Sequence, residues 1–311
     1  MPLVELINLR KEYRNLVAVK GLSLTLEPGD IFGFIGPNGA GKTTTIKMLA
    51  TLLEPTGGIA RVDGINVAEN PEAVRSVIGY MPDAFGVYDD FKVWEYLDFF
   101  AAAYKVPKID RPGLIDMALE LTTLTVKKDA YVDELSRGMK QRLCLAKTLI
   151  HDPKVLLLDE PASGLDPRAR IEIKELLKEL KSMGKTIIVS SHILPELADF
   201  CTSVGIIERG EMIVAGPIEA IMQQVLGGRV LEIRVPDIDR QKAVELLPSV
   251  EHVQSVKQIG ETLRVDYSGT LDDQSDVLLA LIHGGVRVQS FAEQETDLED
   301  IFLRVTKGLV A

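Results

Sequence analysis

Length, composition and charge set the first limits. The chain has 311 residues, of which 46% are hydrophobic, enough for one large domain with a full core and a second, smaller one. Its formal net charge of −11 counts against a general nucleic-acid binder, because a phosphate backbone repels such a surface. The sequence has no run of eighteen or more apolar residues, so it predicts no segment that spans a bilayer.

A glycine-rich turn between an apolar run and a helical pattern is the first strong motif. Residues 30–35, DIFGFI, predict a buried strand, and residues 44–49 predict the start of a helix. Between them GPNGAGKT fits the pattern G-x-x-x-x-G-K-[ST]. Such a turn directs backbone N–H groups and the positive end of a helix at one anion. The candidate nucleotide-binding residues are therefore Gly36, Asn38, Gly39, Ala40, Gly41, Lys42, Thr43 and Thr44.

Lys42 and Thr43 carry the chemistry of this motif. The lysine ammonium is expected to bridge the β- and γ-phosphates of a nucleoside triphosphate, and the threonine hydroxyl to ligate Mg²⁺. The alternative is a chance glycine turn before a helix. Because strand, turn and helix are all in register, the phosphate-binding loop is favoured.

Residues from about 82 to 150 predict a helical insertion in an α/β core. Buried-strand runs lie in 1–80 and 154–218, so we expect a mostly parallel sheet with antiparallel strands near the N-terminus. Aromatic side chains are common at interfaces and in cores. We expect about half of the local set in the core, and Phe85, Val87 and Tyr88 at a contact surface. The set holds nine of the seventeen aromatic residues: Tyr80, Phe85, Tyr88, Phe91, Trp94, Tyr96, Phe99, Phe100 and Tyr104.

An acid pair follows the next buried run. Residues 155–158, VLLL, predict a central parallel strand, and Asp159 and Glu160 come directly after it. Open α/β sheets bind ligands at the carboxyl ends of their strands. Asp159 is therefore expected to hold Mg²⁺ through water, and Glu160 to act as the general base that polarises an attacking water. Two surface acids after a core strand are the alternative, which the phosphate-binding loop disfavours.

The last third of the chain predicts a smaller, separate domain. A helical segment over 218–226 leads to Gly227 and Gly228, which gives domains of 1–226 and 229–311. A further helix is expected over 296–304, and no catalytic motif is present in this domain. Ligand sensing, dimer stabilisation and packing all stay open as its role. The pattern is strand 229–235, helix 239–247, strands 251–258 and 262–267, helix 271–283 and strand 286–292, the order of a ferredoxin-like α+β fold.

Residues 1–220 resemble the ATP-binding-cassette (ABC) ATPases in the order and spacing of their motifs. LSRGM at 135–139 resembles that family's signature, usually LSGGQ, and SGLD at 163–166 resembles its D-loop. His192, after the strand-like residues 186–190, is in the position of the family's switch histidine. Tyr13 is in the position of an aromatic residue that stacks on adenine. The resemblance implies an α/β, P-loop NTPase fold of the ABC type with a helical subdomain.

The resemblance also implies that two copies of the chain share each nucleotide. Ser136 and the Gly138 N–H lie at a predicted helix start, where an anion can bind. The family implies that this anion is the γ-phosphate held by the other copy, in a two-fold dimer with two sites. Asp166 would lie in the interface. His192 would hydrogen-bond the γ-phosphate and hold Glu160 and the water in line.

Three positions depart from the family pattern. Arg137 replaces a glycine and Met139 replaces a glutamine, whereas Ser136 and Gly138, which would touch phosphate, are retained. Asp83 stands where the family usually has a glutamine that senses γ-phosphate and Mg²⁺. A carboxylate cannot donate the amide hydrogen bond, but it could accept one from a metal-bound water. Asp83 is therefore a candidate for both the nucleotide site and the metal site.

The resemblance implies the ATP-hydrolysing subunit of a membrane exporter. The end of the chain is similar to a C-terminal domain on drug- and polysaccharide-type exporter ATPases. Lys42, Glu160 and His192 would be catalytic, with ATP and Mg²⁺ bound and no nucleic acid. The partners would be a second copy and a membrane permease docked near residues 83–100, at the cytoplasmic face of the cell membrane. The alternatives are a soluble ABC-type ATPase acting on ribosomes or DNA, and a nucleotide sensor with negligible turnover, against which Glu160 argues.

Overall fold

The computed structural model describes residues 1–84, 86–193, 197, 200–218, 220–221, 229–269 and 273–293. The chain divides into two compact units, Met1–Ile218 and Glu219–Ala311. Phe85, the boundary predicted at Gly227 and Gly228, and the helix predicted over 296–304 lie outside the described residues. Within the described ranges, no helix is both long enough and apolar enough to cross a membrane.

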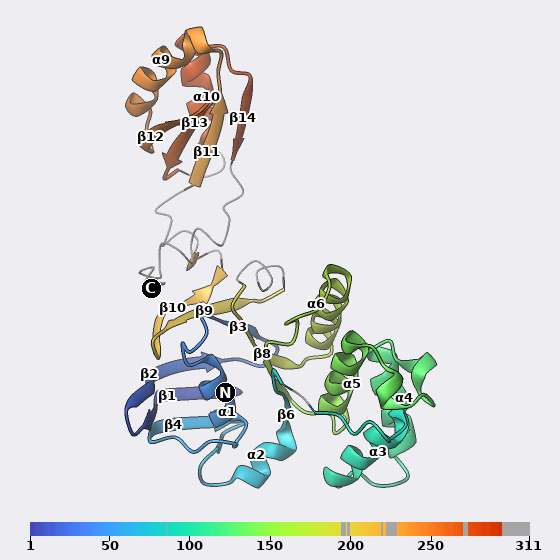
Figure 1. Ribbon diagram of the computed structural model, residues 1–311. Helices are drawn as coiled ribbons and strands as arrows, with labels where there is room; N and C mark the ends of the chain where they lie inside the picture. The colour runs from blue at the N-terminus through green and yellow to red at the C-terminus, as the bar shows by residue number, and fades with distance from the viewer. Residues whose placement is uncertain are drawn as a thin grey trace. The chain divides into compact units, whose positions relative to one another are not determined.

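A six-stranded sheet forms the centre of the first unit (Figure 1). Its order is β10-β9-β3-β8-β7-β6, and only the β9–β10 pair is antiparallel. Every residue of β3, β7 and β8 is buried, as expected for central parallel strands. The mostly parallel sheet predicted from the sequence is therefore confirmed. The strands are β3 (Ile31–Ile35), β6 (Ile78–Met81), β7 (Val155–Asp159), β8 (Thr186–Ser191), β9 (Ser203–Glu208) and β10 (Glu211–Pro217).

A second, antiparallel sheet covers the first helix. Its order is β2-β1-β4-β5, and α1 packs against both β4 of this sheet and β7 of the other. Leu6, Ile46 and Leu157, one from each layer, belong to a single apolar cluster. This packing fixes the start of α1 relative to the central sheet. The elements are β1 (Val4–Tyr13), β2 (Leu16–Leu26), α1 (Lys42–Leu49), β4 (Gly57–Val62), β5 (Ile65–Asn66) and the nearby α2 (Pro71–Val77).

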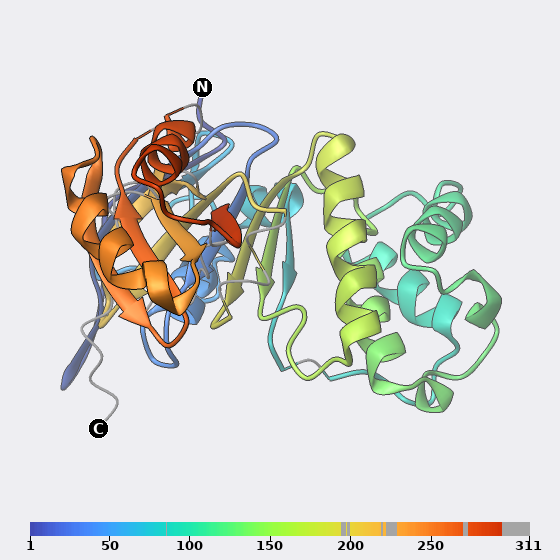
Figure 2. The same cartoon turned by 90° about the horizontal axis from the view of Figure 1, so that it is seen from above.

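Three helices with their own core lie at the β6 side of the central sheet (Figure 2). They are α3 (Val93–Ala103), α4 (Arg111–Leu121) and α5 (Arg137–Leu149), joined by short 3-10 turns at Thr125–Lys127 and Val132–Glu134. Tyr96 is fully buried in their core, and Val87 and Trp94 are partly buried against it. Tyr88 is exposed. We call these helices and their connections the helical group.

The helical group joins the sheet through close contacts at β6. A Cβ on Gly79 would lie 2.4 Å from the Thr148 carbonyl oxygen, so α5 sits directly on this strand. Tyr104, after α3, stacks on His151, after α5, with ring centroids 3.7 Å apart. The His151 Nε2 lies 2.8 Å from the Ile78 carbonyl oxygen, and burial lowers the pKa of His151, so the neutral ring donates this hydrogen bond.

The second unit is a four-stranded antiparallel sheet with two helices packed on one face. The order β12-β13-β11-β14 is that of a ferredoxin-like fold, as the sequence predicts. Leu231, Val265, Val277 and Leu281 are buried in the core between sheet and helices. The last strand is shorter than predicted, beginning at Ser290. The elements are β11 (Arg229–Arg234), α9 (Asp237–Leu246), a 3-10 turn at Leu247–Ser249, β12 (Val253–Ile259), β13 (Thr262–Tyr267), α10 (Gln274–His283) and β14 (Ser290–Glu293).

Replacement of Gly79 by alanine tests the close contact between α5 and β6. Because the nearest atom belongs to the backbone of α5, Gly79→Ala should lower the free energy of unfolding by about 1–3 kcal/mol. Urea unfolding followed by the fluorescence of Trp94, the only tryptophan, reports on the first of the two units. Gly113→Ala in α4 is the control, since no atom lies within 4 Å and alanine favours a helix. An unchanged midpoint for Gly79→Ala would show that α5 is not held there.

Candidate functional site

The glycine-rich loop after β3 has a backbone that side chains would prevent. A Cβ on Gly36 would lie 2.2 Å from the Ile207 carbonyl oxygen, and Gly39 and Gly41 have φ values of 81° and 113°. Gly41 is the N-cap residue of α1 and has no side chain to cap the helix. The first N–H groups of α1 are therefore left without a side-chain cap, which would suit an external anion. Within the loop, Asn38, Gly39 and Thr43 are exposed, Thr44 is half-buried, and Gly36, Ala40, Gly41 and Lys42 are buried.

The Lys42 ammonium lies inside this loop. Its Nζ donates to the carbonyl oxygens of Gly36 and Pro37, at 2.6 and 3.3 Å, and lies 3.6 Å from Glu160 Oε1. Burial lowers the pKa of Lys42, and the carboxylates of Glu160 and Asp159 oppose that shift. The ammonium is thus paired with Glu160 and two loop carbonyl oxygens, and its N–H groups could donate to a phosphate oxygen of a ligand bound in this loop.

Asp159 ends β7 at the place where a metal is expected. It is almost fully buried, and its Oδ1 accepts hydrogen bonds from Thr43 Oγ1 at 3.1 Å and from Ser190 Oγ at 2.6 Å. No group of three His, Cys, Asp or Glu side chains that could hold a metal is found in the part of the chain that the structure describes. One carboxylate and one hydroxyl fit Mg²⁺, which keeps several waters and is completed by substrate phosphates.

Glu160 has its carboxylate between a lysine and a histidine. Its side chain is 13% exposed, and Oε2 lies 2.9 Å from His192 Nδ1. Because a carboxylate only accepts hydrogen bonds, the proton of this contact is on the histidine Nδ1. The carboxylate is thus held in place from two sides, and its role as a general base stays a prediction.

Two motifs of the sequence meet beside α5. Ser136 is the exposed N-cap residue of α5, and its Oγ accepts the Met139 N–H at 3.3 Å. A Cβ on Gly138 would lie 3.5 Å from Leu165 of the predicted D-loop, and one on Gly164 would lie 2.5 Å from the Arg137 guanidinium. The signature segment and the D-loop are therefore neighbours in one chain.

Asp166 and Tyr13 have local contacts that the sequence did not predict. Asp166 is the N-cap residue of α6 (Pro167–Ser182), and its Oδ1 accepts the Ala169 N–H at 3.0 Å. Tyr13 ends β1 with 48% of its surface exposed, and Lys11 Nζ lies 5.4 Å from its ring centroid. One side of the ring thus already faces a cation.

Asp83 follows β6 and lines an open pocket. The pocket is lined by Asp83, Ala84, Leu135, Arg137 and Lys140, so the acid faces two cationic side chains. Among the described contacts, Lys42, Thr43, Asp159, Glu160 and His192 form one connected group. Tyr13, Asp83, Ser136, Gly138 and Asp166 are outside that group.

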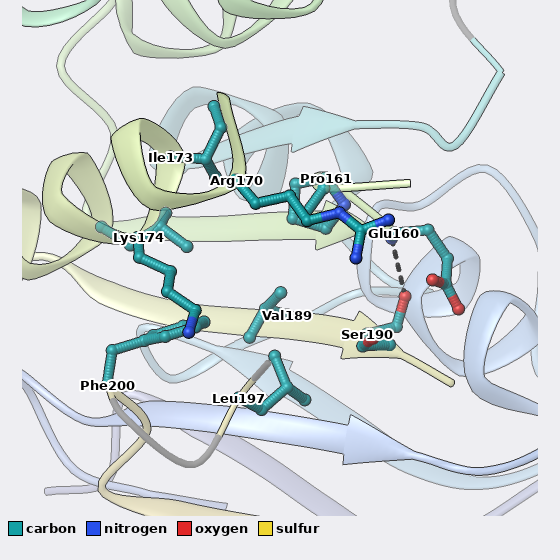
Figure 3. Close-up of a pocket in the computed structure, with 12 residues that line it drawn as sticks. Glu160, Pro161, Arg170, Ile173, Lys174, Val189, Ser190, Leu197 and Phe200 are labelled. Atoms are coloured by element: carbon teal, nitrogen blue, oxygen red, sulfur yellow. Dashed lines mark hydrogen bonds between the residues drawn. The ribbon is translucent and has the colours of Figure 1, made fainter. Parts of the chain in front are cut away.

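Two buried polar residues complete the site and escaped the sequence analysis. Ser190 bonds both members of the acid pair, and the Gln141 side chain donates to the Pro161 carbonyl oxygen, which ties α5 to the chain after Glu160. The only signal for Ser190 is a small polar residue at the end of the apolar run 187–189. Figure 3 shows Ser190 beside Glu160, next to a pocket lined by Ile173 of α6 with Val189, Leu197 and Phe200.

Comparison with known proteins finds relatives of both units. Residues 19–163 match a family described as "ABC transporter", and residues 216–306 match "ATP-binding protein DrrA1-3-like, C-terminal domain". Nod factor export ATP-binding protein I of Paraburkholderia xenovorans (strain LB400) is 36% identical over 306 residues. That alignment covers 97% of this chain and 96% of the relative.

Solved structures match more than two thirds of the chain. A protein described as the ATP binding subunit of an ABC transporter is 29% identical, with a TM-score of 0.65, and covers 71% of this chain and 92% of its own. The protein cbiO1 from Clostridium perfringens, described as part of the ABC transporter complex cbiONQ, is 28% identical with the same TM-score and covers 73% of this chain and 93% of its own.

The cap made by Asp166 can be tested apart from any interface role. Asp166→Ala should cost about 0.5–2 kcal/mol at the start of α6, whereas Asp166→Asn keeps a capping oxygen and should cost little. Hydrogen exchange at the first amides of α6 should be faster in the alanine variant only. Equal exchange in both variants and the unchanged protein would mean that the cap does not hold the helix.

Proposed function

We propose that this chain binds and hydrolyses ATP to power a membrane exporter. The chain belongs to the family of ABC transporter ATP-binding proteins. The observation that carries the proposal is the Glu160 carboxylate, held between Lys42 and His192 beside the phosphate-binding loop. The names of full-length relatives, which refer to Nod factor export, support outward transport. The contacts that select the cargo would lie in the permease.

ATP fits the loop through charge and backbone geometry. The N–H groups at the start of α1 and the Lys42 ammonium would bind the β- and γ-phosphates, and Tyr13 would stack on the adenine with the ring side that Lys11 does not face. Thr43 and Asp159 would hold Mg²⁺, which neutralises phosphate charge when bound.

Hydrolysis depends on how Glu160 is held. Its carboxylate would accept the proton of a water that attacks the γ-phosphorus, while Lys42 stabilises the negative charge that spreads over the phosphate oxygens. The Nδ1–H of His192 orients the carboxylate, and a hydrogen bond from Nε2 to a phosphate oxygen would require the doubly protonated ring. Glu160, Lys42 and His192 are thus the proposed catalytic residues.

Each site would be completed by a second copy of the chain. Ser136 and the N–H of Gly138 are at the exposed start of α5, on a different helix from the one that begins at Lys42. The contact of Gly138 with Leu165 brings Asp166 to the same surface, which supports one continuous interface. In a two-fold dimer, this surface of one copy would face the phosphate-binding loop of the other.

The permease surface is proposed around residues 83–100. The Tyr88 ring lies 5.7 Å from Phe91 and 5.8 Å from Phe99, and Tyr88 and Phe99 are exposed. The rings meet in tilted and edge-to-face arrangements, and a cluster of exposed aromatic rings is typical of the centre of an interface. A permease docked there would hold the protein at the cytoplasmic face of the membrane.

This aromatic surface is connected to the signature segment. The Val132 N–H donates to the Phe91 carbonyl oxygen at 2.9 Å, and Lys140 Nζ lies 2.9 Å from Asp89 Oδ1. Because Val132 precedes and Lys140 follows Ser136, movement of the docking surface would move the signature as well. The alternative, a soluble ATPase acting on ribosomes or DNA, has no comparable support: the charge is −11 and the relatives are named for export.

Glu160→Gln tests the proposed general base. The amide keeps the shape but cannot accept a proton, so turnover should fall roughly 10²–10⁴-fold while the Kd for ATP stays unchanged. A phosphate-release assay and equilibrium nucleotide binding measure the two quantities. Glu175→Gln, the same change at an exposed position of α6, is the control and should hydrolyse ATP normally. A wild-type rate for Glu160→Gln would remove Glu160 from this role.

Ser136→Arg tests the shared site. In the Glu160→Gln background, ATP should cause dimerisation that light scattering detects, and Ser136→Arg should abolish it while the isolated copy still binds ATP. Thr125→Arg, an exposed residue of the helical group with the same change in charge, is the control. Circular dichroism checks that loss of the cap leaves α5 folded. Dimerisation that persists in Ser136→Arg would refute the shared site.

A further inference from the structure

Ser190 is a buried hydroxyl that the proposed mechanism does not yet use. It is the last residue but one of β8 and is fully buried. In the parallel pairing of β7 with β8, Ser190 is directly opposite Asp159. Its side chain therefore reaches the point where β7 ends and Glu160 begins, as Figure 3 shows.

The hydroxyl makes two hydrogen bonds with opposite roles. Its Oγ lies 2.6 Å from Asp159 Oδ1, and since a carboxylate only accepts, the hydroxyl proton is directed there. The Glu160 N–H donates to the same Oγ at 3.0 Å. One side chain thus joins the carboxylate of Asp159 to the backbone of Glu160.

The backbone of Glu160 has a conformation that needs support. Its φ is 51°, in the left-handed region that non-glycine residues adopt mainly when surrounding contacts fix them. Pro161 follows, and Gln141 donates to its carbonyl oxygen. On the other side, Ser190 bonds the Glu160 N–H. These contacts, one on each side of Glu160, hold its backbone in the left-handed conformation.

We propose that Ser190 is a positioning residue for Glu160: its hydroxyl holds the left-handed backbone that directs the carboxylate toward the nucleotide. The proposal rests on the function proposed above for Glu160. The end of β8 then holds Glu160 at two points, with Ser190 on the main chain and His192 on the carboxylate. In this proposal Ser190 acts on the reaction through Glu160 and does not contact the nucleotide.

The surroundings offer little to replace the hydroxyl. The neighbouring pocket is lined on this side mainly by apolar side chains, including Val189, Leu197 and Phe200. A water could replace the hydroxyl only by fitting the small space that it leaves between Asp159 Oδ1 and the Glu160 N–H. Without Ser190, the Glu160 N–H would lose a buried acceptor, and the left-handed backbone would lose the contact that fixes it from β8.

The test is the kinetics of Ser190→Ala in the full-length protein. Without the hydroxyl, the Glu160 carboxylate should be displaced from the position in which it acts as a base. The kcat should then fall roughly 10- to 100-fold, while KM for ATP changes less than about 3-fold. Ser190→Thr retains the hydroxyl and should recover most of kcat. Thr186→Val is the matched control, because Thr186 is buried in the same strand and bonds the Gly29 N–H at the far end, so its loss should leave kcat unchanged.

A second measurement remains informative if the threonine variant does not fold. Because Ser190 acts through Glu160, adding Ser190→Ala to Glu160→Gln should leave the residual turnover unchanged. A further fall in the double variant would overturn the proposal, as would a wild-type kcat for Ser190→Ala. Recovery of the full rate at high Mg²⁺ would also overturn it, because Ser190 would then act on Asp159 alone. If Glu160→Gln itself had the wild-type rate, the proposed function of Glu160 would fail first, independently of Ser190.

Discussion

Three parallel strands that end at one edge of the central sheet determine the site. β3 leads into the loop that holds Lys42, and β7 ends in Asp159. β8 pairs with both strands; it contains Ser190 near its end, and His192 follows it directly. All three strands are buried on both faces, so a slip of one residue would move every side chain to the opposite face, where it would no longer fit its closely packed neighbours. The register is therefore fixed by packing, and the polar ends of the strands are brought together as its consequence.

The residues around Glu160 are also linked to the helical group. Gln141 of α5 bonds the chain just after Glu160, and Arg137 of the same helix lies over Gly164. α5 also rests on β6 through Gly79, which leaves little room for independent movement at that contact. We infer that a shift of the Glu160 main chain would displace Ser136, and that a shift of the aromatic surface near Phe91 would displace Glu160.

Residues that are contiguous in the sequence were predictable, and residues joined only by strand register were not. The glycine-rich loop, the acid pair after 155–158 and the β-α-β-β-α-β order each carry a local signal of composition or spacing. Ser190 is 30 residues from Glu160, and only the pairing of β7 with β8 brings them together. The cap made by Asp166 and the left-handed backbone of Glu160 likewise depend on where one element ends and the next begins.

The central claim is that ATP is hydrolysed in a site built by two copies of the chain, and a dilution series tests it most directly. The rate of phosphate release per mole of protein should rise with protein concentration and level off once the dimer is saturated. A rate per mole that is the same at every concentration, with the protein shown to be monomeric throughout, would contradict the account.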